Sequence, residues 1–285
     1  MVATILDGRE FSRIWENKVK ERADRLKAQG VIPGLAMILV GEDPSSKIYI
    51  KTKKAACKRV GIRSDSYTFP EETSENELVE LINKLNRAGY VHGIIVELPL
   101  PGHIDELRIA RSILPEKDVD GLNPINIGLV PYGRPLLAPC TANGIITFLE
   151  HYGISVAGKH AVIVNRSNLV GRPLAQMLLN RDATVTICHS KTPDVQSHTR
   201  LADILVTAVG RRPKFVLVKE MVKEGVVAVD VGLSRVKGKL YGDLDFDEVK
   251  KVASFITPVP GGVGPVTVAS LLHNTTLAAE LSLPK

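Results

Sequence analysis

The fold is decided by the stretch AVIVNRSNLVGRP, residues 161–173. Its first four residues are apolar, as in a buried strand, and a helical pattern follows Gly171. Backbone N–H groups at the start of a helix that follows such a strand bind the pyrophosphate of a dinucleotide. Only Gly171 stands where the usual fingerprint has a glycine. Taken alone, the stretch fits a structural turn as well as it fits a cofactor-binding loop.

Apolar runs and helical patterns alternate on both sides of this stretch, which is typical of an α/β protein with mainly parallel sheets. A Gly- and Pro-rich stretch at residues 121–139 separates two such series. We therefore expect two α/β lobes, the second a Rossmann-like dinucleotide-binding domain, with the active site in the cleft between them. The first domain is expected over residues 1–139, with a C-terminal helix at 266–285 packing back on it, and the second over residues 140–265. Strands are predicted at residues 35–40, 62–69, 92–98, 160–165, 183–189, 203–209 and 226–231.

Start and stop signals predict the ends of several helices. One helix runs over residues 45–59 and is closed by Gly61. A second opens at a capping box formed by Ser74 and Glu77 and ends near residue 89. Thr141 is expected to cap a third, which reaches about residue 151. The last starts at Pro265, because proline is favoured in a first turn.

The second strand of the later series favours NADP over NAD. NAD-binding folds place an acidic residue at the end of this strand to bond the ribose 2′-hydroxyl, whereas NADP sites need groups that bind a 2′-phosphate. Here the strand ends at His189, Ser190 and Lys191, and no acid follows until Asp194. Arg166, on the preceding turn, can add a charge-assisted bond to the same phosphate. The predicted cofactor is NADP.

Composition limits the class of protein. The 285 residues are 44% hydrophobic and 24% charged, and the longest apolar runs are too short for a membrane helix. Lysine and arginine cluster only at residues 51–54 and 58–59, so the net charge of +6 indicates a solvated surface or an anionic small ligand rather than nucleic acid. The three cysteines form no metal-ligand pattern and suit a reducing cytosol. We expect a soluble, cytoplasmic protein.

Tyr49 and Lys53 are four residues apart, so they share one face of the predicted helix. A solvated lysine beside a half-buried tyrosine is the simplest interpretation. The Tyr-x-x-x-Lys motif of short-chain dehydrogenases is excluded, because that motif follows the nucleotide-binding turn along the chain and this pair precedes it. Glu97, at the end of the third strand, can face the helix. Its carboxylate would favour the ammonium form of Lys53, and burial would favour the neutral amine, a balance suited to proton transfer.

Six motifs in this chain occur in the order seen in the bifunctional methylenetetrahydrofolate dehydrogenase–methenyltetrahydrofolate cyclohydrolases, and they span nearly all of its length. The chain resembles this family in each of them. They are Tyr49-x-x-x-Lys53, Gly93-Ile94-Ile95-Val96-Glu97-Leu98-Pro99-Leu100-Pro101, Lys117-Asp118-Val119-Asp120-Gly121, Pro139-Cys140-Thr141, Arg166-Ser167-x-x-Val170-Gly171-x-Pro173 and Pro258-Val259-Pro260-Gly261-Gly262-Val263-Gly264-Pro265.

The resemblance implies oxidation of 5,10-methylenetetrahydrofolate by NADP and hydrolysis of the product to 10-formyltetrahydrofolate at the same site. Lys53 would manage the proton transfers, Tyr49 would stack on the aminobenzoate ring, and Asp120 would bond the pterin. The implied catalytic residues are Lys53, Tyr49, Glu97 and Asp120. The implied cofactor-binding residues are Asn165, Arg166, Ser167, Ser190 and Leu233, of which the arginine and the two serines hold phosphates and the leucine touches the nicotinamide side. No metal is implied. A homodimer is expected, with a folate substrate that can carry a polyglutamate tail.

Three residues depart from the family pattern. Glu97 stands where the family usually has glutamine, Asn165 where it has glycine or a small residue, and Ala142 where it has proline. Only Glu97 bears on the chemistry, since a glutamate pairs with Lys53 more strongly than an amide does. A dehydrogenase with little cyclohydrolase activity is therefore an alternative. A non-catalytic binding module would require a broken Tyr49–Lys53 pair or a degraded cofactor turn, and the sequence has neither.

Overall fold

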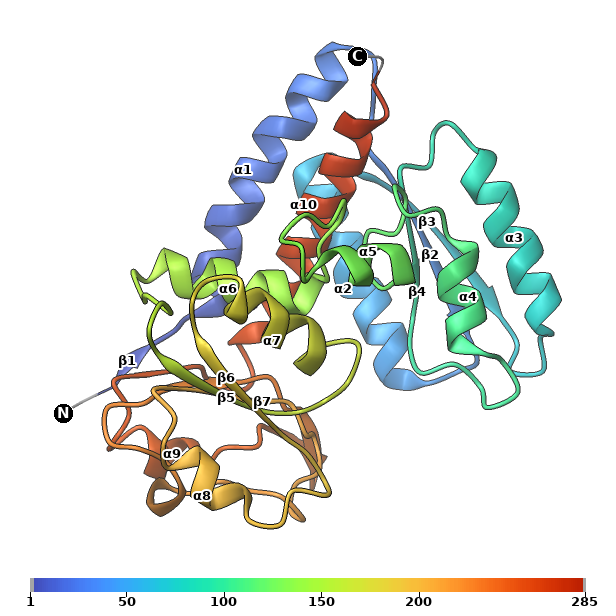
Figure 1. Ribbon diagram of the computed structural model, residues 1–285. Coiled ribbons are helices and arrows are strands. Elements are labelled where there is room, and N and C mark those ends of the chain that lie inside the picture. Colours follow the sequence, from blue (N-terminus) through green and yellow to red (C-terminus); the bar gives the residue numbers. More distant parts are fainter. Residues whose placement is uncertain (1–2, 284–285) are drawn as a thin grey trace. The chain divides into compact units, whose positions relative to one another are not determined.

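The computed structural model describes residues 3–283, which form two compact units (Figure 1). One, the three-stranded unit, consists of residues 13–130, 134–140 and 268–283. The other, the six-stranded unit, consists of residues 3–12, 131–133 and 141–267. Each unit has its own parallel β-sheet. The α/β class predicted from the sequence is confirmed.

The three-stranded unit is built on a parallel sheet of order β3-β2-β4. The central strand β2 (Gly34–Val40) is buried along its whole length. It pairs with β3 (Arg63–Phe69) on one side and β4 (Gly93–Val96) on the other. A strand covered on both faces is a continuous apolar run, which explains why this strand could be recognised in the sequence.

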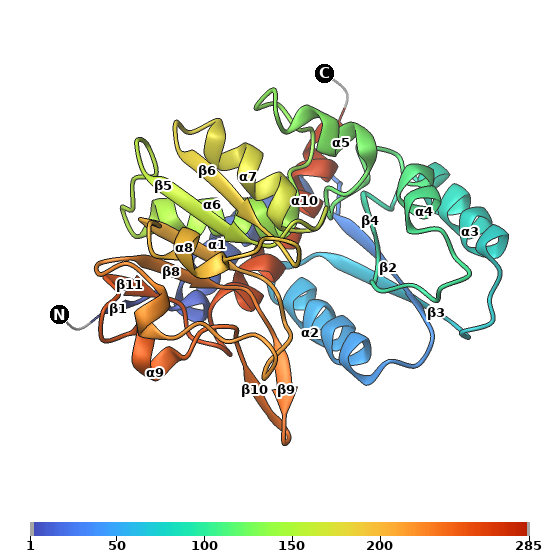
Figure 2. The ribbon, with the colours of Figure 1, turned by 60° about the horizontal axis from the view of Figure 1, so that its bottom comes forward.

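Helices cover this sheet. Ala36, Ile38 and Val40 lie on one face of β2 and pack in a cluster with apolar side chains of α3 (Glu75–Arg87) and α4 (Glu106–Ser112). Figure 2 shows these two helices side by side. The other helices of the unit are α2 (Pro44–Val60), α5 (Pro124–Leu129), α1 (Gly8–Ala28) from residue 13 and α10 (Val263–Leu281) from residue 268.

Local signals fix the ends of α2 and α3. The Asp43 carboxylate accepts a hydrogen bond from the backbone N–H of Ser46, and α2 ends at Gly61, whose φ of 78° is left-handed. In α3, Ser74 and Glu77 bond each other's backbone N–H groups, so the predicted capping box is confirmed. These ends set the position of the Tyr49–Lys53 face along α2.

The six-stranded unit has a parallel sheet of order β1-β11-β8-β7-β5-β6. Strand β5 is followed along the chain by β6 on one side and then by β7 on the other. In open α/β sheets, ligands bind where the strand order reverses in this way, beyond the carboxyl ends of the strands. The strands are β1 (Thr4–Ile5), β5 (His160–Val164), β6 (Thr184–Cys188), β7 (Ile204–Thr207), β8 (Val227–Asp230) and β11 (Phe255–Ile256).

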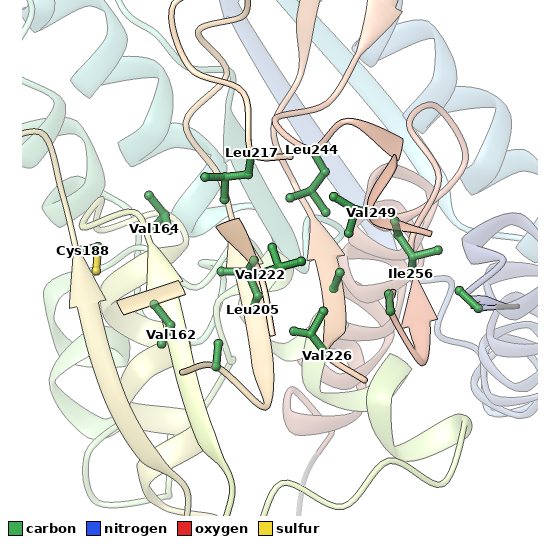
Figure 3. Packing of buried hydrophobic residues seen from close by; sticks show 14 residues of the cluster. Val162, Val164, Cys188, Leu205, Leu217, Val222, Val226, Leu244, Val249 and Ile256 are labelled. Atoms are coloured by element: carbon green, nitrogen blue, oxygen red, sulfur yellow. The ribbon is translucent and has the colours of Figure 1, made fainter. Parts of the chain in front are cut away.

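One face of this sheet carries a continuous apolar core (Figure 3). Val162 and Val164 of β5, Leu205 of β7 and Ile256 of β11 point to the same side, because alternate residues of a strand face one way. Leu217 and other side chains from the connecting segments close over them. Other elements of the unit are α6 (Cys140–His151) from residue 141, α7 (Gly171–Leu179), α8 (Val195–Thr199), the 3₁₀ turn Lys219–Met221, α9 (Phe246–Val249) and the antiparallel hairpin of β9 (Ser234–Val236) and β10 (Lys239–Tyr241).

Some details differ from the sequence-based expectations. Helix α6 begins at Cys140, so Thr141 lies inside its first turn and is not a cap; its hydroxyl instead accepts from Thr267. Helix α10 begins at Val263, two residues before Pro265. Residues 3–12 group with the six-stranded unit, because β1 pairs with β11. Across residues 3–283, no helix combines the length and apolar character needed to span a bilayer.

Candidate active site

Lys53 and Glu97 form an ion pair in the three-stranded unit. Lys53 lies on α2, and Glu97 follows β4, where its backbone N–H bonds Ile38 and extends the sheet by one residue. The Lys53 Nζ donates to the Glu97 Oε1 at 2.6 Å. The lysine side chain is 16% exposed and the glutamate 9%, so water reaches little of the pair. The expectation that the strand end faces this helix is confirmed.

Tyr49 lies one turn before Lys53 on the same helix and keeps 42% of its surface exposed. Burial raises the pKa of its phenol; the positive charge of Lys53 opposes this rise, and the negative charge of Glu97 adds to it. The tyrosine therefore keeps accessible surface and is electrostatically coupled to the ion pair. Such a ring can stack on a flat ligand.

The two aspartates of the Lys117–Gly121 motif have different surroundings. Asp118 is buried, and its carboxylate accepts from the backbone of Leu122 and Asn123 and from the Asn126 amide. It therefore shapes the turn. Asp120 keeps some exposed surface and makes none of these loop contacts. Desolvation raises the pKa of its carboxyl, and the charge of Lys53 opposes the rise. The positive charge of Lys53 therefore belongs to the electrostatic surroundings of Asp120.

Cys140 and Asn274 support the segment that carries Asp120. The backbone N–H of Cys140 donates to the Asp120 carbonyl at 3.1 Å, and its thiol donates to the Val119 carbonyl at 3.1 Å. The Asn274 amide donates to the carbonyls of Val119 and Ala138. Sequence reasoning noted Cys140 only as part of a motif and missed Asn274. In the sequence, Asn274 stands out only as a polar residue within the apolar C-terminal helix.

The predicted nucleotide turn lies between β5 and α7, as expected. Asn165 organises it: its Oδ1 accepts from the N–H and hydroxyl of Ser167 and from the N–H of Gly171. Its Nδ2 donates to Ala208, which follows β7, at 2.6 Å. A Cβ at Gly171 would lie 2.1 Å from the Asn165 carbonyl oxygen, so only glycine fits there. The amide thus fixes the turn at the point where the strand order reverses.

The residues expected to bind phosphate are accessible. Arg166 and Ser190 are exposed, and Ser167 is partly buried. Beyond β6, His189, Ser190 and Lys191 form a turn closed by a bond from the His189 N–H to Thr192. With hydroxyl and cationic groups here and no acid before Asp194, the site fits a 2′-phosphate. Leu233, 42% exposed, follows β8 at the same sheet edge.

Comparison with known proteins identifies the family. The family model described as the tetrahydrofolate dehydrogenase/cyclohydrolase catalytic domain matches residues 6–120. The model described as the NAD(P)-binding domain of the same family matches residues 139–283. The chain belongs to this family. The resemblance expected from the six motifs is therefore confirmed, as is the dinucleotide-binding character of the second domain.

Members of the tetrahydrofolate dehydrogenase/cyclohydrolase family resemble the chain over its whole length. A bifunctional protein FolD from Geobacillus thermodenitrificans is 52% identical, and the match covers 98% of each chain. A crystal structure of the bifunctional FolD enzyme from Campylobacter jejuni has a TM-score of 0.95 at 48% identity, covering 99% of this chain and 100% of that one. The Trypanosoma brucei enzyme, complexed with NADP and an inhibitor, has a TM-score of 0.95 at 36% identity and full coverage of both chains.

Proposed function

We propose that this chain oxidises 5,10-methylenetetrahydrofolate to 5,10-methenyltetrahydrofolate with NADP and then hydrolyses the product to 10-formyltetrahydrofolate. Membership of a family with both activities and 52% identity to a bifunctional FolD protein support the pair of reactions. The observation that carries the hydrolytic half is the buried contact between Lys53 and Glu97. That contact supplies a side chain able to move protons next to the exposed ring of Tyr49.

In the oxidation, the carbon that loses a hydride lies between two nitrogens, which stabilise the resulting cation. No side chain needs to take a proton in this step, so the protein acts mainly by aligning the reacting rings. Tyr49 is suited to stack on the aminobenzoate ring, and Asp120 to bond the pterin. Tyr49 is carried by α2 and Asp120 by the Lys117–Gly121 segment, both in the three-stranded unit.

NADP, when bound, would supply the acceptor for the hydride. Arg166, Ser167 and Ser190 are proposed to hold its phosphates. Leu233 is proposed to contact the nicotinamide side. Asn165 was expected to bind the cofactor. Since its amide bonds Ser167, Gly171 and Ala208, we propose that it contributes by shaping the turn rather than by direct contact.

Hydrolysis needs a side chain that moves protons. Water adds to the methenyl carbon and loses one proton. The bond from that carbon to N5 then breaks, N5 takes up the second proton of the water, and the formyl group stays on N10. Lys53 in its neutral form can accept the first proton of the attacking water and release it to solvent. Glu97 orients the Lys53 amine and stabilises it when it is charged.

A single experiment tests both steps. Purified protein is mixed with methylenetetrahydrofolate and NADP, and absorbance is recorded over time for NADPH and for the methenyl intermediate. We expect NADPH to form with little accumulation of the intermediate. NADPH formation with the full build-up of methenyltetrahydrofolate would leave only the dehydrogenase half of the proposal. If no NADPH forms, the proposed oxidation is refuted.

We further propose that the protein is a homodimer and accepts folates with a polyglutamate tail, on the basis of the family resemblance. Light scattering coupled to gel filtration gives the mass, which for a dimer is twice the 31.0 kDa of one chain. Competition between monoglutamyl and polyglutamyl methylenetetrahydrofolate tests the second statement, and equal or tighter binding of the longer form is expected.

A further inference from the structure

Two buried aspartates lie at the carboxyl edge of the six-stranded sheet. Asp230 ends β8 and is 3% exposed; Asp243 follows the β9–β10 hairpin and is fully buried. The Asp230 carboxylate accepts from the backbone N–H groups of Gly232, Asp243 and Leu244 at 2.8–3.0 Å. One side chain therefore joins the segment after β8 to the segment after the hairpin.

Asp243 continues this connection to β7. Its two carboxylate oxygens accept from the N–H groups of Val209 and Gly210 at 2.6 and 2.9 Å. The Arg212 guanidinium in turn donates to the carbonyls of Gly242 and Leu244. The segments after β7, after β8 and after the hairpin are thus held together mainly through two carboxylates.

The backbone packs so closely around the two carboxylates that Gly232 and Gly242 cannot carry a side chain. A Cβ at Gly232 would lie 2.2 Å from the Asp243 carboxyl carbon, and a Cβ at Gly242 would lie 2.0 Å from an Asp230 oxygen. Gly210 has a φ of 64°, and a Cβ there would lie 3.2 Å from the carbonyl oxygen of Leu233. The backbone at Gly232, next to Leu233, therefore packs directly against the Asp243 carboxylate, and the Leu233 carbonyl lies close to Gly210, whose N–H donates to that carboxylate.

The network is continuous with the nucleotide turn. Asn165 bonds Ala208, the residue before the Val209–Gly210 pair that Asp243 holds. Burying two acids is unfavourable, and it raises the pKa of both Asp230 and Asp243. Acids that are buried at an unfavourable free energy, at the edge of a sheet where ligands bind, are typical of groups that hold a functional geometry.

We propose that Asp243, supported by Asp230, is a positioning residue for hydride transfer: it holds the backbone at Gly210 and Leu233 where the nicotinamide ring is bound. This rests on the proposed function of the chain. Asp243 itself contacts neither substrate nor cofactor. Its effect is therefore on the alignment of the two rings, to which hydride transfer is sensitive.

Asp243→Asn tests the proposal, because the amide keeps the size but places an NH₂ group against a backbone N–H. We expect kcat for NADPH formation to fall about tenfold or more, since a small misplacement of reacting groups costs that much. The dissociation constant of NADP should change less than about threefold, because the phosphates are bound elsewhere. Hydrolysis of added methenyltetrahydrofolate, which transfers no hydride, should stay within about twofold of the wild type.

The matched control is Asp203→Asn. Asp203 also accepts from a backbone N–H, that of His160, but at the opposite, amino edge of the same sheet. This variant should retain both activities. If Asp243→Asn is insoluble, Thr207→Val decides, because it removes only the hydroxyl that donates to Asp230 at 3.2 Å. A fall of about two- to threefold in hydride transfer alone is expected there.

Each outcome bears on the proposal. Loss of reduction with normal hydrolysis and near-normal NADP binding supports it. Parallel loss of both activities overturns it. Normal NADPH formation in Asp243→Asn also overturns it, and Thr207→Val takes the place of that variant if Asp243→Asn is insoluble. A wild-type protein without NADPH formation would instead refute the proposed function, so the two failures are distinguishable.

Discussion

The Lys53 ammonium donates to the Glu97 carboxylate at 2.6 Å, and both groups are largely buried. In a buried pair, removing one partner leaves the other charge without compensation, which costs about 3–5 kcal/mol. Removing either charge alone therefore changes stability as well as chemistry. Variants of this pair need controls that separate the two effects.

Lys53→Met should abolish cyclohydrolase activity and leave much of the dehydrogenase activity. The reason is that only hydrolysis needs a side chain to move a proton. The measurement is the rate of methenyltetrahydrofolate hydrolysis beside the rate of NADPH formation. Equal loss of both activities would indicate that Lys53 acts only in binding or folding.

Two controls accompany this variant. Lys54→Met changes the neighbouring, exposed lysine and should leave both rates near the wild-type values. Lys53→Met combined with Glu97→Gln removes the unpaired buried charge. If the double variant is more stable than Lys53→Met but equally inactive in hydrolysis, the loss is chemical and not a consequence of misfolding.

Arg166→Ala should weaken NADP binding roughly tenfold and barely change NAD binding. Arg166 is exposed, and a bond to a charged group contributes about 1.5–3 kcal/mol. Because the 2′-phosphate is the only difference between the two dinucleotides, the effect should be confined to NADP. Titration of both dinucleotides measures it.

Arg181→Ala is the matched control, since Arg181 lies just past the end of α7 and pairs with Glu150. It should leave the affinities for both dinucleotides unchanged. If NAD and NADP binding weaken in parallel in Arg166→Ala, the arginine contacts a part common to both, and the assignment of the 2′-phosphate is wrong.

The buried carboxyl of Asp230 should give the free energy of unfolding an unusual pH dependence. Burial raises the pKa of its carboxyl from 3.8 to about 6. Since the folded pKa lies above the unfolded one, the proton stabilises the fold at low pH, and this stabilisation is lost as the pH rises through about 6. Asp230→Asn cannot titrate at this position. Relative to this variant, the free energy of unfolding of the wild type should rise by on the order of 1 kcal/mol when the pH is lowered from about 7.5 to about 5.

Urea unfolding at the two pH values measures this difference. Comparing wild type with variant cancels the contributions of partly exposed acids such as Glu75 and Glu248, whose pKa values are lowered and which act in the opposite direction. A difference that does not change with pH, or that changes with the opposite sign, would show that Asp230 stays ionised throughout this range.

Most of the central strands could be predicted from the sequence, because they are buried on both faces and appear as continuous apolar runs. Strands β1 and β11 have two residues each, too few for a period to be visible. Helix α1 was not predicted, since charged residues are mixed among its apolar ones and its mean hydropathy is low. The placement of residues 3–12 depends on the pairing of β1 with β11, which no local pattern records.

The site was predictable where its residues belong to one helix or end a recognisable strand, as with Tyr49, Lys53 and Glu97. It was not predictable where a contact joins distant segments. Asn274 bonds Val119, 155 residues away, and Asp243 bonds Val209, 34 residues away. Asn165, expected to bind the cofactor, also bonds the turn and Ala208, and the sequence could not indicate these contacts.

Glu97→Gln should move the pH–rate profile of hydrolysis to lower pH. The Glu97 carboxylate is in direct contact with the Lys53 amine, and a neighbouring negative charge favours the protonated form of an amine over the neutral form that accepts a proton. Glutamine has nearly the same size and can still accept a bond from the lysine, but it removes the negative charge. The ascending limb of the profile should therefore shift to lower pH. The measurement is the hydrolysis rate of methenyltetrahydrofolate across pH for both proteins.

The competing mechanism gives a different profile. If Glu97 is itself the base, or holds a proton that it donates, Gln cannot replace it, and hydrolysis should fall sharply at every pH with no shift. The matched control is Glu16→Gln. Glu16, on α1, pairs at 2.7 Å with Arg59, which lies on the same helix as Lys53, and its replacement should leave the profile unchanged. An unshifted profile of normal height in Glu97→Gln would mean that the charge of Glu97 has no part in the reaction. Because the contact is 2.6 Å long and largely shielded from water, we expect the shift.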